Sequence, residues 1–93
     1  MTVKEMALEE RPREKMLSKG EKSLSNDELL AILLRTGTKR KNAIQLANYI
    51  INKDIQGLRC LQDMTIEELC EIDGVGLSKA TQIKAALELG IRV

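Results

Sequence analysis

Apolar side chains recur every three or four residues along most of the chain, and this spacing predicts helices rather than strands. Between residues 26 and 34 the apolar positions run nearly all round the predicted helix, which places that helix in the middle of a bundle. A second amphipathic helix is predicted from about residue 42 to residue 52, and a last one from about residue 77 to residue 89. The last helix is expected to bury Leu77, Ala80, Ile83 and Leu87, with Ala86 and Ile91 beside them.

Start and stop signals delimit these helices. Pro12 suits the first position of a helix, where its missing N–H is not needed, and Gly20 is positioned to end that helix. Two capping boxes open later helices: Ser25 with Glu28, and Thr65 with Glu68. The fold class predicted is therefore all-α, a compact bundle of about five short helices. Residues 1–10 show no clean period and are expected to form a flexible arm before a domain of residues 11–93.

The segment between the last two predicted helices carries the strongest functional signal. Gly74 and Gly76 flank Val75, and glycine permits positive φ and leaves no side chain in front of the backbone N–H groups. Val75 is expected to point inward and fix the turn to the core. A helix starting after Gly76 would add unpaired N–H groups and the positive end of its dipole, which together suit a phosphate. The alternative is a plain helix–helix turn closed by a glycine.

This pattern resembles the helix-hairpin-helix motif of proteins that bind DNA without regard to sequence. The two halves of the chain also resemble each other: Glu28 and Ile32 match Glu68 and Ile72 at an offset of 40 residues. Gly37 answers Gly76, while Arg35 stands where a glycine would. We therefore expect tandem helix-hairpin-helix units, the first of them degenerate. Two helical hairpins rich in Leu and Ile would also look alike by composition alone.

Charge is unevenly distributed, although the formal net charge is only +1. Residues 35–53 contain five basic and no acidic side chains, whereas residues 54–78 contain one basic and six acidic ones. Weak, salt-sensitive binding to a few phosphates is the expected consequence. The candidate nucleic-acid contacts in the first hairpin are Gly37, Lys39, Arg40 and Lys41. Those in the second hairpin are Gly74, Val75, Gly76, Ser78 and Lys79.

Composition excludes several classes of function. The 93 residues include no histidine and two cysteines, which removes a zinc site and most acid–base and nucleophilic arrangements. We expect Cys60 and Cys70 to be buried, inert thiols. A base-excision glycosylase would need an acidic residue well downstream of the hairpin, and none follows Glu88. No membrane-length apolar run or signal peptide is apparent, so the expected location is cytoplasmic, with no membrane partner and no organic cofactor.

Two further features remain open to two interpretations. Arg11, Arg13 and Lys15 suit either a solvated helix face or contacts with phosphate. Tyr49, the only aromatic residue, lies off the apolar stripe of its helix and suits either packing or base stacking.

With these residues in view, the chain from about Glu9 to Arg92 resembles the amino-terminal domain of the RadC family, historically labelled DNA repair proteins. The resemblance rests on three segments: Arg11 to Lys15, Leu24 to Gly37, and Ile72 to Gly90. It implies a partner domain resembling JAB/MPN metalloproteases, which would follow this one. The implied functions are a non-catalytic domain that binds double-stranded or branched DNA, or a helical module that docks the JAB/MPN-like domain or another protein.

Helix-hairpin-helix proteins in general imply two sets of backbone contacts. Phosphate would be bound by the N–H groups of Gly74, Gly76, Ser78 and Lys79, with the Lys79 side chain adding charge. A monovalent cation, K⁺ or Na⁺, would be held by the backbone carbonyls of Cys70, Ile72 and Val75. Asp73 and Leu77 stand where many such hairpins have proline.

Overall fold

The computed structural model describes residues 11–93 and shows six α-helices and two short 3-10 helices in that range, with no strand among them. The helices are α1 (Pro12–Lys19), α2 (Asn26–Leu34), α3 (Ala43–Ile51), α4 (Cys60–Asp63), α5 (Ile66–Cys70) and α6 (Leu77–Arg92), and the 3-10 turns are η3 (Glu21–Ser23) and η4 (Gly57–Arg59). The all-α prediction is confirmed. The arm predicted at residues 1–10 lies outside the described residues.

The helix boundaries follow the signals in the sequence. Pro12 opens α1 and Gly20 ends it with a φ of 89°. The side chain of Ser25 accepts a hydrogen bond from the backbone N–H of Glu28, and that of Thr65 accepts one from Glu68. In each box the glutamate carboxylate accepts the N–H of the capping residue in return. Both predicted capping boxes are therefore confirmed.

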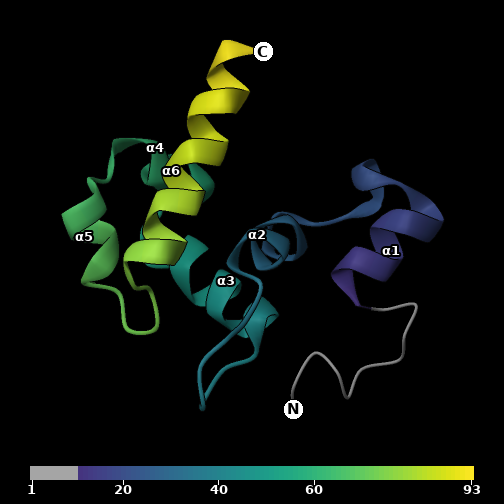
Figure 1. Cartoon of the computed structure of the whole chain (residues 1–93), viewed down its shortest axis with the longest axis horizontal. Helices are drawn as coiled ribbons and strands as arrows, with labels where there is room; N and C mark the ends of the chain where they lie inside the picture. The colour runs from purple at the N-terminus through teal and green to yellow at the C-terminus, as the bar shows by residue number, and fades with distance from the viewer. Residues whose placement is uncertain (1–10) are drawn as a thin grey trace.

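α2 lies at the centre of the bundle and contacts α1, α3 and α6 (Figure 1). It pairs with α3 as one helix–loop–helix unit, and α5 pairs with α6 as the other. Buried aliphatic side chains from both units form one core, in which Leu34, Leu46, Leu61, Leu69 and Ile83 are almost fully enclosed. Neither unit alone would bury enough apolar surface, so the two share a core.

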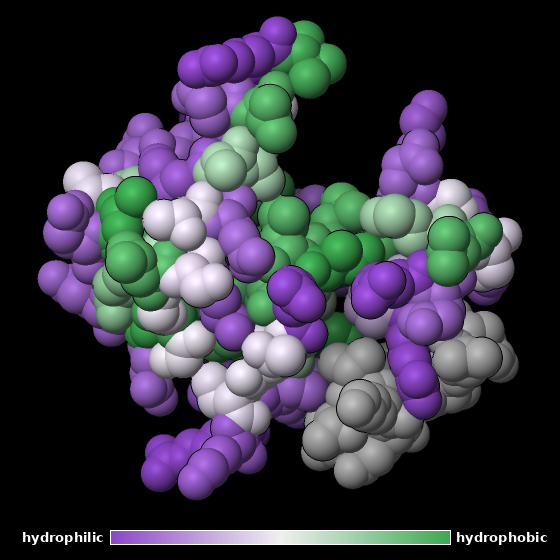
Figure 2. All heavy atoms as spheres, viewed as in Figure 1, coloured by the Kyte–Doolittle hydropathy of each residue, from purple (hydrophilic) through white to green (hydrophobic). Residues whose placement is uncertain are grey.

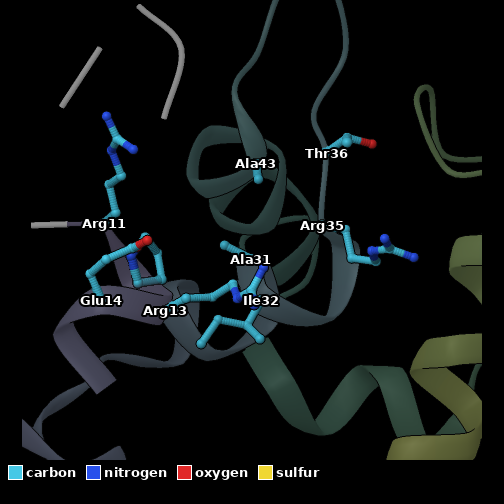
Figure 3. Close-up of a pocket in the computed structure, with 9 residues that line it drawn as sticks. Arg11, Arg13, Glu14, Ala31, Ile32, Arg35, Thr36 and Ala43 are labelled. Carbon is cyan, nitrogen blue, oxygen red and sulfur yellow. The ribbon is translucent and has the colours of Figure 1, made fainter. Parts of the chain in front are cut away.

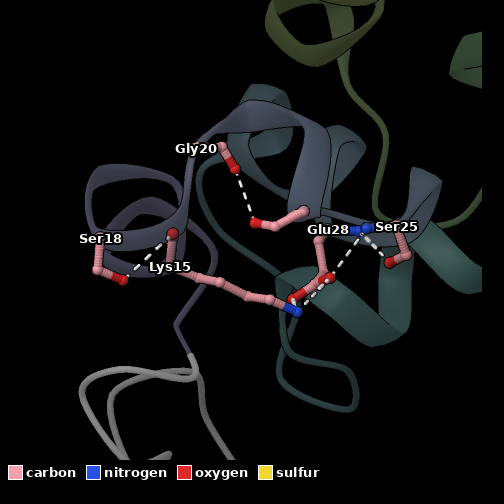
Figure 4. A network of polar contacts seen from close by, with 6 residues as sticks. Lys15, Ser18, Gly20, Ser25 and Glu28 are labelled. Atoms are coloured by element: carbon pink, nitrogen blue, oxygen red, sulfur yellow. Dashed lines mark hydrogen bonds and ion pairs between the residues drawn. The ribbon is translucent and has the colours of Figure 1, made fainter.

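α1 lies at one side of the bundle, and an ion pair connects it to the start of α2. Lys15 Nζ lies 3.2 Å from both carboxylate oxygens of Glu28, the same glutamate that completes the capping box with Ser25 (Figure 4). The backbone N–H of Ser25 and the Lys15 ammonium lower the pKa of the Glu28 carboxyl below its ordinary value, against a smaller opposing effect of desolvation.

Several predicted burials are wrong. Leu77 is 66% exposed because it is the first residue of α6 and faces away from the core, and Ile91 is 62% exposed near the far end of that helix. Cys70 is exposed and Cys60 half-buried, so neither is a buried thiol. Leu17 on α1 is also exposed, although a leucine is usually buried. Across residues 11–93, no helix combines the length and apolar character that crossing a membrane requires.

Candidate nucleic-acid interface

Gly74 is required by the fold itself. Its φ is 93°, in the region that side chains with a β-carbon avoid. A β-carbon there would also lie 2.5 Å from Thr38 Cγ2 and 3.4 Å from Leu46 Cδ1. The turn between α5 and α6 thus presses closely against the first helix–loop–helix unit, and only glycine satisfies both constraints.

Gly76 behaves differently. Its φ of −91° and ψ of −174° are extended backbone, so Gly76 does not use the positive φ that glycine permits. These angles are close to those of the capping residues Ser25, Asn42 and Thr65, because Gly76 is the N-cap of α6. A β-carbon at Gly76 would have no atom within 4 Å. Nothing in the described part of the chain therefore requires glycine at this position.

The start of α6 presents a set of unpaired backbone N–H groups, which we call the α6 seat. Within residues 11–93, the N–H groups of its members donate to no acceptor, and no side chain caps the helix. The members are Gly74, Gly76, Leu77, Ser78 and Lys79. Val75 is only 3% exposed and its N–H bonds to the Ile72 carbonyl, so it fixes the turn to the core as predicted. The 16-residue α6 adds the positive end of its dipole to the seat.

The loop before α3 is closed by its own side chains. Asn42 caps α3, accepting the N–H of Gln45, while Gln45 accepts the N–H of Asn42 in a capping box that the sequence analysis missed. Within the loop, the Thr38 hydroxyl accepts the N–H groups of Arg40 and Lys41. The first unit is therefore degenerate in a physical sense, because local groups already satisfy several of its donors.

Gly37 does not take the place that Gly76 takes in the second unit. It lies several residues before the N-cap of α3, because a turn at residues 38–41 intervenes. A β-carbon on Gly37 would collide with the backbone of Lys41 and Asn42. The loop itself therefore requires this glycine. A contact between Gly37 and DNA remains a prediction.

The two loops meet at one edge of the molecule (Figure 1). Lys79 Nζ donates a 2.9 Å hydrogen bond to the hydroxyl of Thr36, which joins the first turn of α6 to the residues after α2. Lys39 and Arg40 are exposed on the loop that projects from this edge, where Figure 2 shows hydrophilic atoms. Asp73 is exposed beside the α6 seat and opposes the basic groups.

Tyr49 on α3 has two lysines near the faces of its ring. Lys41 Nζ lies 4.7 Å and Lys53 Nζ 5.1 Å from the ring centroid, within the range of cation–π attraction. Lys41 is thus directed toward α3 and away from the exposed tip of its loop. The sequence signal that could have indicated this arrangement is helical spacing, since Lys53 follows Tyr49 by four residues.

The possible cation site stays a prediction. The Ile72 carbonyl accepts the Val75 N–H at 3.0 Å, and each carbonyl oxygen has a second lone pair for another partner. Within the described range, no group of three or more acidic or cysteine side chains is arranged to hold a metal ion. Any ion at this turn would therefore be held by the backbone.

Comparison with known proteins gives one consistent result. The family described as UPF0758 N-terminal matches residues 3–81. A UPF0758 protein of Clostridioides difficile (strain 630) is 84% identical over 91 residues, which are 98% of this chain and 39% of that protein. A UPF0758 protein of Alkaliphilus oremlandii (strain OhILAs) is 60% identical over 93 residues, all of this chain and 40% of that protein. The chain thus spans about two fifths of these relatives. No solved structure matches it.

Proposed function

The chain belongs to the UPF0758 N-terminal family, and we propose that it serves there as a non-catalytic domain that holds DNA by its phosphates. One observation supports the proposal above the others. The fold needs no glycine at position 76, yet a side chain there would stand beside the unpaired N–H groups of α6. A glycine that the protein's own packing does not require is explained by a ligand that approaches the backbone closely.

The proposed ligand atom is a phosphate oxygen. Backbone N–H groups at a helix start donate well to an oxyanion, and no side chain from the described residues competes for the α6 seat. Lys79 lies at the same helix start, and one of its three ammonium donors is used by Thr36. Lys39 and Arg40, on the neighbouring loop, would reach a second phosphate. Such contacts position a backbone and read no bases.

Double-stranded or branched DNA is the proposed partner, and the link to DNA repair follows from the resemblance to the RadC family. We expect binding in the range of weak non-specific binders, with a dissociation constant on the order of 100 μM at physiological salt and tighter binding at low salt. Asp73 and Glu71, both exposed near the seat, limit the affinity. A monovalent cation at the carbonyls of Cys70, Ile72 and Val75 would offset part of that negative charge.

Fluorescence anisotropy with a labelled duplex and a labelled four-way junction in low salt tests the proposal. The variant is Gly76→Glu with Lys79→Glu. Its control is Gly90→Glu with Lys22→Glu, which changes the charge by the same amount at two exposed positions, the glycine having open space around it. Binding should be lost in the first variant and kept in the second. No binding of the native chain at about 100 μM, or an equal loss in both variants, would refute a specific seat.

A second candidate is a docking module for the remainder of the longer relatives. It is favoured by exposed apolar side chains on two helices: Leu29 and Leu33 on α2, each 37% exposed, and Leu89 on α6, 65% exposed. Figure 2 shows apolar atoms in the hollow over α2, between α1 and the upper part of α6. Unchanged DNA affinity in the Gly76→Glu, Lys79→Glu variant would favour this function.

A further inference from the structure

A cavity of about 550 Å³ lies between the start of α1 and the end of α2 (Figure 3). Its volume falls within the usual range of sites for small molecules, which begins at roughly 300 Å³, and is far more than one phosphate fills. Polar side chains come from both sides: Arg11, Arg13 and Glu14 from the start of α1, and Arg35 and Thr36 from the end of α2. Ile32 and the buried Ala31 contribute apolar lining. We call this the arginine cavity.

Three arginines and one acidic residue, Glu14, line the arginine cavity, so its net charge is positive. In Figure 3 the guanidinium groups of Arg11 and Arg35 extend away from each other, one on either side of the apolar lining. Across residues 11–93, the side chains of Arg13 and Arg35 take part in no hydrogen bond or ion pair. The start of α1 faces the same space without a side-chain cap, so the N–H groups of Arg13 and Glu14 add donors. A concave site lined by the unpaired guanidinium groups of Arg13 and Arg35 is suited to a phosphate or another oxyanion.

The backbone at Arg35 gives a separate reason to assign its side chain a role. Its φ of 69° and ψ of −48° are strained for a residue with a β-carbon, and the Thr36 N–H bonds to the Leu34 carbonyl at 2.8 Å in a γ-turn. Gly74 has a comparable positive φ after α5. Glycine would adopt the turn without strain, so the backbone conformation does not explain why this residue is an arginine. A ligand that binds the guanidinium group would explain it.

We propose that the arginine cavity binds the phosphate of a nucleotide, with its sugar and base against the apolar lining. Thr36 lines the cavity and also accepts the hydrogen bond from Lys79 at the α6 seat. The two sites therefore adjoin. The nucleotide is either free or the phosphorylated end of a DNA strand. Only the second source rests on the proposed function.

NMR titration of the chain with thymidine 5′-monophosphate tests the proposal, with thymidine and inorganic phosphate as reference ligands. The monophosphate should shift the amide signals of Arg13, Ile32, Arg35 and Thr36. It should bind more tightly than inorganic phosphate, and thymidine should not bind. The variants are Arg13→Ala and Arg35→Gly, the latter free of backbone strain. Each should weaken binding about tenfold, the loss of one charge-assisted contact. The control Lys22→Ala removes an exposed charge from η3 and should have no effect.

Three results would overturn the proposal. The first is binding of thymidine as tight as that of the monophosphate, and the second is no shift of these amide signals at about 10 mM monophosphate, on the order of the weakest useful affinity. The third is unchanged affinity for the monophosphate in both arginine variants. Two single-stranded oligonucleotides, with and without a 5′-phosphate, separate the sources. If only the phosphorylated strand displaces thymidine 5′-monophosphate from the arginine cavity, a strand end is a ligand. If neither strand displaces it, the ligand is the free nucleotide. Duplex binding through the α6 seat is measured independently, since Lys79→Glu should abolish it while leaving thymidine 5′-monophosphate binding intact.

Discussion

Replacing Gly76 with asparagine should make the protein more stable and a poorer DNA binder. The substitution copies the arrangement before α3, where Asn42 has a φ of −74° and a ψ of 175° and caps the helix. Gly76 has nearly the same angles, −91° and −174°, and open space where the new side chain would stand. The asparagine oxygen would therefore accept the N–H of Lys79, as Asn42 accepts that of Gln45.

Two terms contribute to the stability gain. An asparagine cap exceeds a glycine cap by a few tenths of a kcal/mol, and removing a glycine from the unfolded chain adds about 0.4–1 kcal/mol. The sum, about 1 kcal/mol, should raise the melting temperature of a domain of this size by roughly 4–8 °C. The same side chain fills the α6 seat and uses one of its donors, so DNA affinity should fall about tenfold, the effect of one charge-assisted hydrogen bond.

Thermal unfolding and duplex binding by anisotropy, measured on the same preparations, check both effects. Gly90→Asn is the matched control, because Gly90 also has open space around it but lies at the far end of α6. It should leave DNA affinity unchanged. Unaltered binding in a stabilised Gly76→Asn protein would show that the N–H groups do not hold the phosphate. A loss of stability would show that Gly76 does not act as an N-cap.

Three other substitutions address the turns and the cap. Gly74→Ala should lower the free energy of unfolding by more than about 2 kcal/mol in urea denaturation, because a β-carbon meets both a positive φ and Thr38. Arg35→Gly should raise that free energy by about 1 kcal/mol, since relief of strain exceeds the entropy cost of glycine. Stability should also fall as the pH drops below about 4.5, because the lowered pKa of Glu28 means that protonation favours the unfolded chain. Glu28→Gln should lower stability at pH 7 and flatten this pH dependence. A slope as steep as that of the native chain would exclude Glu28 as its source.

Local signals were sufficient for most of the helices and for the inward turn at Val75. Ser25 and Thr65 each have glutamate three residues later, and a capping box depends only on residues that are close in sequence. Pro12 and Gly20 likewise act through their own backbone preferences. These are the features that can be predicted from sequence, because no distant part of the chain changes their outcome.

The errors arise where two distant segments meet. Spacing placed Leu77 on the buried face of α6, but Leu77 is the first residue of that helix and is exposed, and the core begins with Ala80. Cys70 likewise ends α5 on the solvent side. The matching offset paired Gly37 with Gly76, although a turn inserted before α3 separates their roles. The apolar period indicates which face of a helix is buried, but it does not indicate at which residue along the helix the core begins or ends.

The two loops divide between them what a single hairpin would need. The loop before α3 carries Lys39 and Arg40 but uses its own Asn42 to cap the helix, whereas the start of α6 has open N–H groups beside the acidic Asp73. Basic side chains attract a phosphate at long range, and open N–H groups without net positive charge around them give short-range geometry. The bond from Lys79 to Thr36 joins the two. A phosphate backbone lying along this edge would meet both, so neither loop should bind DNA well when the other is altered.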